Sequence, residues 1–218
     1  MTTETTSPGP GDPAGDATAR PEGVQQRRTR LRRQEILDVA AATFANRGYN
    51  NASLAEIADE VGISAPAILH HFRSKEGLLT ELLRARDGER VGDAADGSRP
   101  RGLAFLDHLV DTVARNAERP GITQLYTVLS AEAVTDGHPA QTWFRDRYVG
   151  LRAMVRQALA EALDDGELSA GTDLDETAAA VVAVMDGLQV QWLLDPERVD
   201  MVAVTRRTIA ALLASLTP

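Results

Sequence analysis

The sequence predicts an all-α protein of about nine helices, with an N-terminal three-helix helix-turn-helix domain followed by a larger helical domain. Composition favours helices over sheets. Alanine is abundant and aromatic residues make up only 4% of the chain, whereas β-branched residues rarely alternate with polar ones. Clusters of Gly, Pro and Asp separate the apolar segments from one another, so these segments are expected to form distinct helices.

Charge is distributed unevenly along the chain. The net charge is −9, yet residues 27–75 carry eight basic side chains against five acidic ones. Residues 1–26 carry one Arg against four acids, and residues 76–218 carry fourteen basic against twenty-three acidic side chains. One basic segment in an otherwise acidic chain suits a protein that offers a single face to a polyanion.

The first 26 residues show no apolar periodicity and are rich in Pro, Gly, Thr and Asp. Because such a segment cannot bury enough surface to offset the entropy of ordering, a disordered tail is expected over 1–26. Five of the next seven residues are arginines: Arg27, Arg28, Arg30, Arg32 and Arg33. They form either a solvated terminus or an arm that contacts the minor groove or the phosphates of DNA.

A DNA-binding domain is expected over 27–75. Its first helix has apolar residues on one side, namely Ile36, Leu37, Ala40 and Phe44. Gly48 is expected to end this helix, because glycine readily takes the positive φ found just after a helix. Residues 53–72, SLAEIADEVGISAPAILHHF, then predict two short amphipathic helices, 54–61 and 65–72.

The two short helices are expected to meet at a three-residue turn. Ser53 and Glu56 have the spacing of a capping box at the start of the first helix. In the turn, Gly62 permits a left-handed conformation, Ile63 can fill the core between the helices, and Ser64 can cap the second helix. This arrangement is that of a helix-turn-helix, whose second helix enters the major groove.

Residues 33–83 resemble the DNA-binding domain of the tetracycline-repressor (TetR) family. The resemblance rests on RRQEILDVAAATFANRGY, SLAEIADEVGIS and HHFRSKEGLLTELL. It implies a linking fourth helix, a helical body over 76–218 that binds an effector, and a two-fold dimer. In that body, DGLQVQWLLDPERVD resembles the C-terminal domain of the subgroup that includes betaine-pathway regulators.

Candidate DNA contacts come from the arginine arm, the helix N-termini and the second helix of the motif. They are Arg30, Arg32, Arg33, Ser53, Ser64, Ala65, Pro66, Ala67, His70, His71 and Lys75. Helix N-termini favour phosphate, and the resemblance implies a backbone contact for His71. Alternatively, the serines are caps, His70 is an exposed helix residue, and Lys75, the only lysine, is a solvated side chain.

The second helix of the motif lacks hydrogen-bond donors where it would first enter the groove. Ala65, Pro66 and Ala67 cannot read bases by bidentate hydrogen bonds, so contacts to thymine methyl groups and DNA shape are expected to contribute to specificity. Leu69 stands where the family often has a tyrosine, which puts one phosphate contact in doubt.

Six further helices are expected after the motif, at about 76–90, 101–118, 121–135, 139–165, 173–194 and 197–216. The candidates for an effector pocket combine apolar and polar side chains: Trp143, Gln189, Trp192, Tyr126, Met154, Met185 and His108. Stripes on the last two helices are candidates for a dimer interface: Val181, Met185, Leu188, Ile209, Leu212, Leu213 and Leu216. For each residue, the alternative is ordinary packing within one chain.

Several classes of function are excluded by the sequence. The chain has no Cys, and no nucleophile-elbow, zincin or phosphate-loop motif, so neither enzymatic activity nor a cofactor or metal is expected. No apolar run approaches the length of a membrane span, so a cytoplasmic protein is expected. The expected partners are palindromic double-stranded DNA, a small molecule and a second copy. The function is then a repressor released from DNA by a ligand, or alternatively an architectural DNA-binding protein without an effector.

Overall fold

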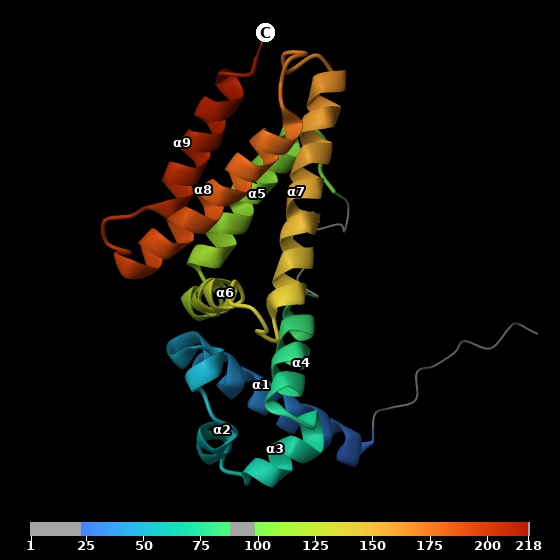
Figure 1. Ribbon diagram of the computed structural model, residues 1–218, viewed down its shortest axis with the longest axis vertical. Helices are drawn as coiled ribbons and strands as arrows, with labels where there is room; N and C mark the ends of the chain where they lie inside the picture. The colour runs from blue at the N-terminus through green and yellow to red at the C-terminus, as the bar shows by residue number, and fades with distance from the viewer. Residues whose placement is uncertain (1–22, 88–98, 218) are drawn as a thin grey trace, which may run out of the picture.

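The computed structural model describes residues 23–87 and 99–217, and within them helices joined by turns are the only regular secondary structure. Its elements are α1 (Val24–Asn51), α2 (Leu54–Val61), α3 (Ala65–Phe72), α4 (Lys75–Asp87), α5 (Leu103–Ala117), α6 (Pro120–Glu132), α7 (Gln141–Asp164), α8 (Leu174–Leu194) and α9 (Met201–Ala214). Helices α1 to α4 form one end of the molecule, α5 and α7 to α9 form the other, and α6 lies between them (Figure 1). The predicted all-α fold is confirmed.

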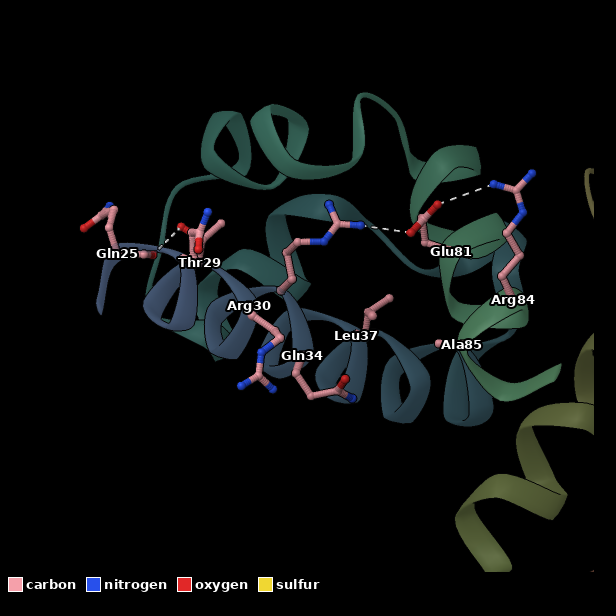
Figure 2. Close-up of a pocket in the computed structure, with 10 residues that line it drawn as sticks. Gln25, Thr29, Arg30, Gln34, Leu37, Glu81, Arg84 and Ala85 are labelled. Atoms are coloured by element: carbon pink, nitrogen blue, oxygen red, sulfur yellow. Dashed lines mark hydrogen bonds and ion pairs between the residues drawn. The ribbon is translucent and has the colours of Figure 1, made fainter. Parts of the chain in front are cut away.

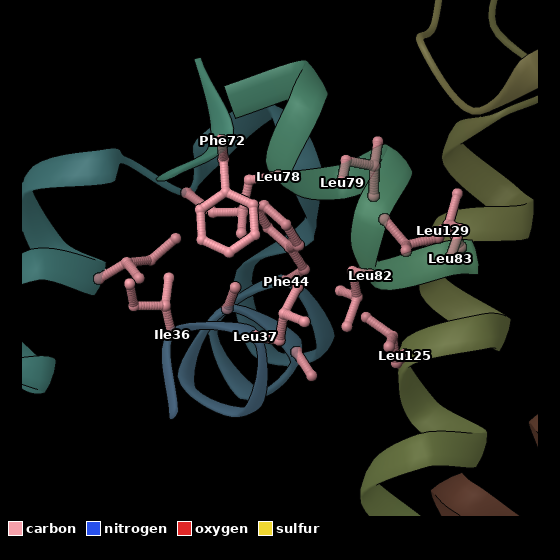
Figure 3. Close-up of a cluster of buried hydrophobic side chains, with 14 of the residues drawn as sticks. Ile36, Leu37, Phe44, Phe72, Leu78, Leu79, Leu82, Leu83, Leu125 and Leu129 are labelled. Atoms are coloured by element: carbon pink, nitrogen blue, oxygen red, sulfur yellow. The ribbon is translucent and has the colours of Figure 1, made fainter. Parts of the chain in front are cut away.

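Two hydrophobic cores hold the helices together. The first combines α1 to α4 with one side of α6 and the start of α7. Figure 3 shows Leu125 and Leu129 of α6 beside the leucines of α4 and Phe44 of α1, and both α6 leucines are fully buried. The second core joins α5, α7, α8 and α9. The helix-turn-helix end therefore shares its core with α6, far along the chain.

Helix α1 is longer than predicted at both ends. It begins at Val24, so residues 24–26, expected in the tail, are helical. At Gly48 the backbone leaves helical geometry, with φ 75° and ψ 169°, and the helix then continues to Asn51. The positive φ predicted at this glycine is present, but it marks a break within the helix. The remainder of the expected tail, 1–22, lies outside the described residues.

The helix-turn-helix forms with the predicted bounds. The Ser53 hydroxyl accepts a hydrogen bond from the Glu56 amide at 3.1 Å, while the Glu56 carboxylate is paired with Arg47 at 2.6 Å. Gly62 takes a left-handed conformation, φ 73° and ψ 37°, and its N–H donates to the end of α2. The turn therefore depends on glycine in the way that the sequence predicts.

The later helices lie close to their predicted positions, with one clear shift. The last helix begins at Met201, not at 197, because the capping carboxylate is that of Asp200. Its Oδ1 accepts a hydrogen bond from the Ala203 amide at 2.9 Å, whereas Asp195 closes the preceding turn through its backbone oxygen. The predicted end of the fourth helix, near 90, lies outside the described residues.

Helix α8 has an unusual composition. By length and composition alone it could cross a membrane, and only 22% of its most apolar 18-residue window is buried. The sequence-based expectation concerned uninterrupted apolar runs, and Asp186 and Gln189 interrupt this one, although the window stays apolar on average. Packing within one chain thus leaves much of this apolar helix exposed or only half-buried.

Candidate DNA-binding surface and effector cavity

Helix α3 has one buried side and one exposed side. Ile68 and Phe72 are buried in the first core and fix the helix in place. Pro66, Leu69 and His70 are exposed, and the neighbouring Ala65, Ala67 and His71 are half-buried. A short helix that packs on the core with one side and exposes the other side has the geometry required for insertion into the major groove of DNA.

The first turn of α3 leaves its capping side chain unused. Ser64 occupies the N-cap position, but its side chain makes no capping hydrogen bond, and the Ala67 amide donates to the Ser64 backbone oxygen at 2.9 Å. Ser53, in contrast, caps α2. The Ser64 hydroxyl therefore lies at a positive helix end without a capping role, which suits contact with a phosphate.

Arg33 has a role within the domain, which differs from its predicted contact with DNA. Its guanidinium donates to the His71 backbone oxygen at 2.8 Å and to the Glu81 carboxylate at 2.9 Å. It also lies over the Phe72 ring, 4.6 Å from the centroid. Arg33 thus ties α1 to the end of α3 and to α4, because the packing of α3, the recognition helix of the helix-turn-helix, against the first core brings these groups together.

Arg30 and Arg32 are exposed at the start of α1. Arg30 lines a groove of about 660 Å³ between α1 and α4 together with Arg33, Glu81 and Arg84 (Figure 2). Arg32 pairs with Glu35 at 2.9 Å on the surface. These two arginines remain candidates for an arm that contacts DNA.

The contrast between Arg30 and Arg33 predicts different effects for two alanine variants. Arg33→Ala should lower the free energy of unfolding by about 1.5–3 kcal/mol, because it removes hydrogen bonds of a charged group. Arg30→Ala should reduce the salt dependence of DNA binding by about one phosphate contact per arm. Urea unfolding of Arg33→Ala and DNA titrations of Arg30→Ala at several salt concentrations measure the two effects; unchanged stability in Arg33→Ala, or an unchanged salt dependence in Arg30→Ala, would contradict the assignment.

Lys75 and His71 differ in how much they are available to DNA. The Lys75 ammonium lies over the Tyr49 ring, 4.4 Å from its centroid, and burial lowers the Lys75 pKa while Glu132 opposes this shift. This placement within the protein argues against the predicted phosphate contact. The half-buried His71 ring borders the exposed side of α3, and burial, then the neighbouring His70, Arg33 and Arg32 charges, lower its pKa.

A cavity of about 910 Å³ lies between α5, α6, α7 and α8. Four of the residues predicted for an effector pocket line it: His108, Tyr126, Met185 and Gln189. The other three, Trp143, Met154 and Trp192, are not among the lining residues. Trp143 packs on the first core, 4.8 Å from the Phe144 ring centroid, and Met154 packs on the second core. Side-chain type alone could not distinguish the residues that line the cavity from those that pack elsewhere.

The sequence-based prediction missed the polar centre of the cavity. The Tyr148 hydroxyl hydrogen-bonds the Asp186 carboxylate and the Ser130 hydroxyl, which links α7 to α8 and to α6. Burial raises the pKa of Asp186, and burial together with Asp186 raises the pKa of Tyr148 to about 12. The sequence did contain a signal for this polar site, because Asp186 is the only charged residue between Glu176 and Asp195.

Asp186→Asn is expected to stabilise the protein at neutral pH. Burial raises the pKa of Asp186 above its unfolded value, so the folded state holds the proton of this carboxyl more tightly. The stability that this proton contributes is fully present below the unfolded pKa and is lost as pH rises through the folded pKa. The amide keeps an acceptor for Tyr148 but carries no charge. Thermal unfolding should give a higher midpoint for the variant at pH 7.5 and a smaller difference as pH falls toward 4. Exposed Asp164→Asn serves as the control, and equal midpoints for Asp186→Asn and wild type at pH 7.5 would refute this reading.

Two residues predicted for a dimer interface are buried inside one chain. Val181 is 0% and Ile209 is 4% exposed, both in the second core, so neither can contact a second copy. Met185 lines the cavity, while the half-buried Leu212, Leu213 and Leu216 pack against the second core. The half-buried Leu188 belongs to neither hydrophobic core and does not line the cavity, so it stays a candidate for the dimer interface.

The outer faces of α8 and α9 have a distinct composition. On α8 the exposed residues include Ala179, Ala183, Gly187, Val190 and Leu194. On α9 the exposed residues are Arg206, Arg207 and Thr208 in the middle and Ala210, Ala211 and Ala214 toward the C-terminal end. Leu194 is 81% exposed. Small exposed residues allow two helices to approach closely, and exposed apolar residues gathered on one helix face are typical of an interaction surface. No group of three or more potential metal ligands lies together in the described part of the chain.

Comparison with known proteins places both parts of the chain. Residues 36–82 match the model of bacterial regulatory proteins of the tetR family, and residues 98–214 match the C-terminal model of BetI-type transcriptional repressors. The chain is 31% identical over 129 residues to the HTH-type transcriptional repressor KstR2 of Rhodococcus jostii, a match that covers 57% of this chain and 54% of that protein. It is 29% identical over 180 residues to the HTH-type transcriptional regulator TtgR of Pseudomonas putida, covering 78% and 83%.

A solved structure shares the same arrangement of helices. The transcriptional regulator FadR of Bacillus subtilis, in complex with stearoyl-CoA, superimposes with a TM-score of 0.70, covering 84% of this chain and 98% of that one. The sequence identity is 17%, so this likeness concerns the fold.

Proposed function

Because the chain belongs to the TetR family of bacterial regulatory proteins, we propose that it is a cytoplasmic, homodimeric repressor that a small molecule releases from a palindromic operator. The observation that carries the proposal is that one protein has both a recognition helix, α3, with an exposed side and a cavity between α5, α6, α7 and α8. The DNA contacts are assigned to Ser53, Ser64 and the exposed side of α3, with His70 and His71 at its C-terminal end. Arg30 and Arg32 extend the surface toward the minor groove.

The dimer forms through the outer faces of α8 and α9. Two recognition helices are needed to read two half-sites one helical turn apart. Only 22% of the most apolar window of α8 is buried within one chain, and the small residues on its exposed side permit close packing against a symmetry mate. The bundle of four helices in such a dimer also covers Leu194, which is otherwise exposed.

The effector is a small molecule that has both apolar surface and hydrogen-bonding groups. At about 910 Å³, the cavity has the size of small-molecule sites. Its walls combine apolar side chains such as Leu109 and Phe144 with polar and charged ones, among them Arg115, Arg147 and the Tyr148–Asp186 pair. A ligand that binds better to the form with displaced recognition helices shifts the population away from DNA. An architectural DNA-binding protein has no use for such a cavity, which favours the regulator over that alternative.

One experiment tests the proposal in two steps. DNA bound by the purified protein is selected from a random pool, and the selected site is then used to screen metabolites for release. We expect a single palindromic site of two half-sites and at least one class of compound that lowers affinity for it. Binding without sequence preference at moderate salt would refute the regulator, and a specific site that no compound releases would favour the alternative without an effector.

A further inference from the structure

We propose that Glu132, at the C-terminal end of α6, is a positioning residue that holds the break in α1 and thereby sets the spacing of the two recognition helices. This inference rests on the proposed operator-binding function. It concerns a residue outside both the DNA surface and the cavity.

The Glu132 carboxylate occupies the gap left by the broken helix. Its Oε2 accepts a hydrogen bond from the Tyr49 amide at 2.6 Å, although the two residues are far apart in the chain. Because Gly48 departs from helical geometry, the Tyr49 N–H is turned out of the α1 hydrogen-bond pattern and needs another acceptor. The Glu132 carboxylate, at the end of α6, supplies that acceptor.

Gly48 leaves the space that this contact requires. A Cβ at position 48 would overlap the Glu132 carboxylate, and the positive φ of 75° would strain any larger residue. The break in α1 and the carboxylate of α6 therefore fit each other. Nearby, the Gln124 side chain donates to the Ala45 backbone oxygen at 3.1 Å, a second polar tie between α6 and α1.

Other polar groups lie near the Glu132 carboxylate. The His138 Nδ1 accepts from the Ala140 amide at 3.2 Å, so the proton of the neutral ring lies on Nε2, 3.9 Å from Glu132 Oε2. Burial lowers the pKa of His138, with Glu132 opposing the shift. The Lys75 ammonium, over the Tyr49 ring, adds positive charge at the start of α4. Three helices and the α6–α7 connection thus converge on one carboxylate.

The other side of α6 connects this contact to the cavity. Ser130, two residues before Glu132, lines the cavity and hydrogen-bonds Tyr148, which in turn bonds Asp186. A molecule that displaces the Tyr148–Asp186 pair acts on the last turn of α6. That turn ends at the residue that binds the break in α1, so its movement displaces the helix-turn-helix as a unit.

Half-site spacing gives a direct test on the full-length protein. Adding one base pair between half-sites rotates and shifts one of them relative to the other, so a rigid dimer should discriminate strongly against it. We compare affinities for the selected operator and for versions with one base pair added or removed. Wild type, Glu132→Ala, Glu132→Gln and the control Val134→Ala are measured, the control being an exposed residue two positions beyond Glu132.

We expect Glu132→Ala to reduce the spacing discrimination by about tenfold, which corresponds to one hydrogen bond to a charged group, while Glu132→Gln, which keeps an acceptor, and Val134→Ala reduce it less than threefold. Amide exchange at Tyr49 should also accelerate in Glu132→Ala alone. Uniformly weaker binding with unchanged discrimination would overturn the positioning role, as would unchanged Tyr49 exchange. Wild-type protein without any spacing preference would instead refute the dimeric operator reader, and this inference with it.

Discussion

Ser64→Asp should abolish specific DNA binding while leaving the fold intact. Aspartate is as good an N-cap as serine, so α3 should form normally. The new carboxylate, however, is placed at the helix end that is proposed to face a phosphate, once in each protomer. Because like charges in close apposition cost several kcal/mol, we expect a loss of at least about 100-fold in operator affinity. Fluorescence anisotropy with the selected operator measures this loss.

Ser64→Asn provides the matched control for charge. Asparagine has the same shape as aspartate and caps helices equally well, but it is neutral, so its affinity should stay within about fivefold of wild type. Thermal unfolding should show that both variants fold. Equal affinity for Ser64→Asp and Ser64→Asn would place the N-terminus of α3 away from the DNA backbone and would require a different docking geometry.

Ala183→Arg should convert the protein to a monomer. Ala183 lies midway along the exposed face of α8, and in a two-fold interface the substitution brings two unpaired guanidinium groups into an apolar contact. Because burying an uncompensated charge costs several kcal/mol, the dimer should dissociate at micromolar concentration. The monomer would contact one half-site only, so operator affinity should fall by at least about 100-fold. Sedimentation equilibrium and operator titrations measure the two effects.

The control for this prediction is Ala153→Arg, an equally small and exposed position on α7. It adds the same charge outside the proposed interface, so the protein should remain a dimer with unchanged operator affinity. A dimer in Ala183→Arg, or dissociation in Ala153→Arg, would move the interface away from the outer face of α8.

The helix-turn-helix could be predicted in detail because its signals are local. Capping residues, a glycine turn and apolar spacing all act within about twenty residues, and the structure places α2 and α3 at the predicted bounds. The break at Gly48 could be located but not interpreted, since its partner, Glu132, lies on another helix. The start of α9 was misplaced because Asp195 and Asp200 are equally plausible caps in sequence, and only the turn between them distinguishes their roles.

The cavity and the dimer face were harder to predict because both depend on which side of a helix faces inward. Periodicity correctly identified the stripe containing Val181 and Ile209, but it could not show that this stripe faces the core of the same chain. The bulky Trp143 and Trp192 were natural candidates for a ligand site, yet the polar centre is formed by Tyr148 and Asp186. A carboxylate alone in an apolar helix was the more informative signal, because burying it is costly without a function.

The first core has a consequence for engineering chimeric regulators. Leu125 and Leu129 are fully buried against residues of the DNA-reading end, so a cut after α4 would expose apolar surface on both fragments. A hybrid regulator that joins this DNA-binding domain to the ligand-binding domain of another protein therefore needs the matching side of α6 as well as the first four helices. Specificity for DNA can be transplanted only together with the helix that carries the signal to it.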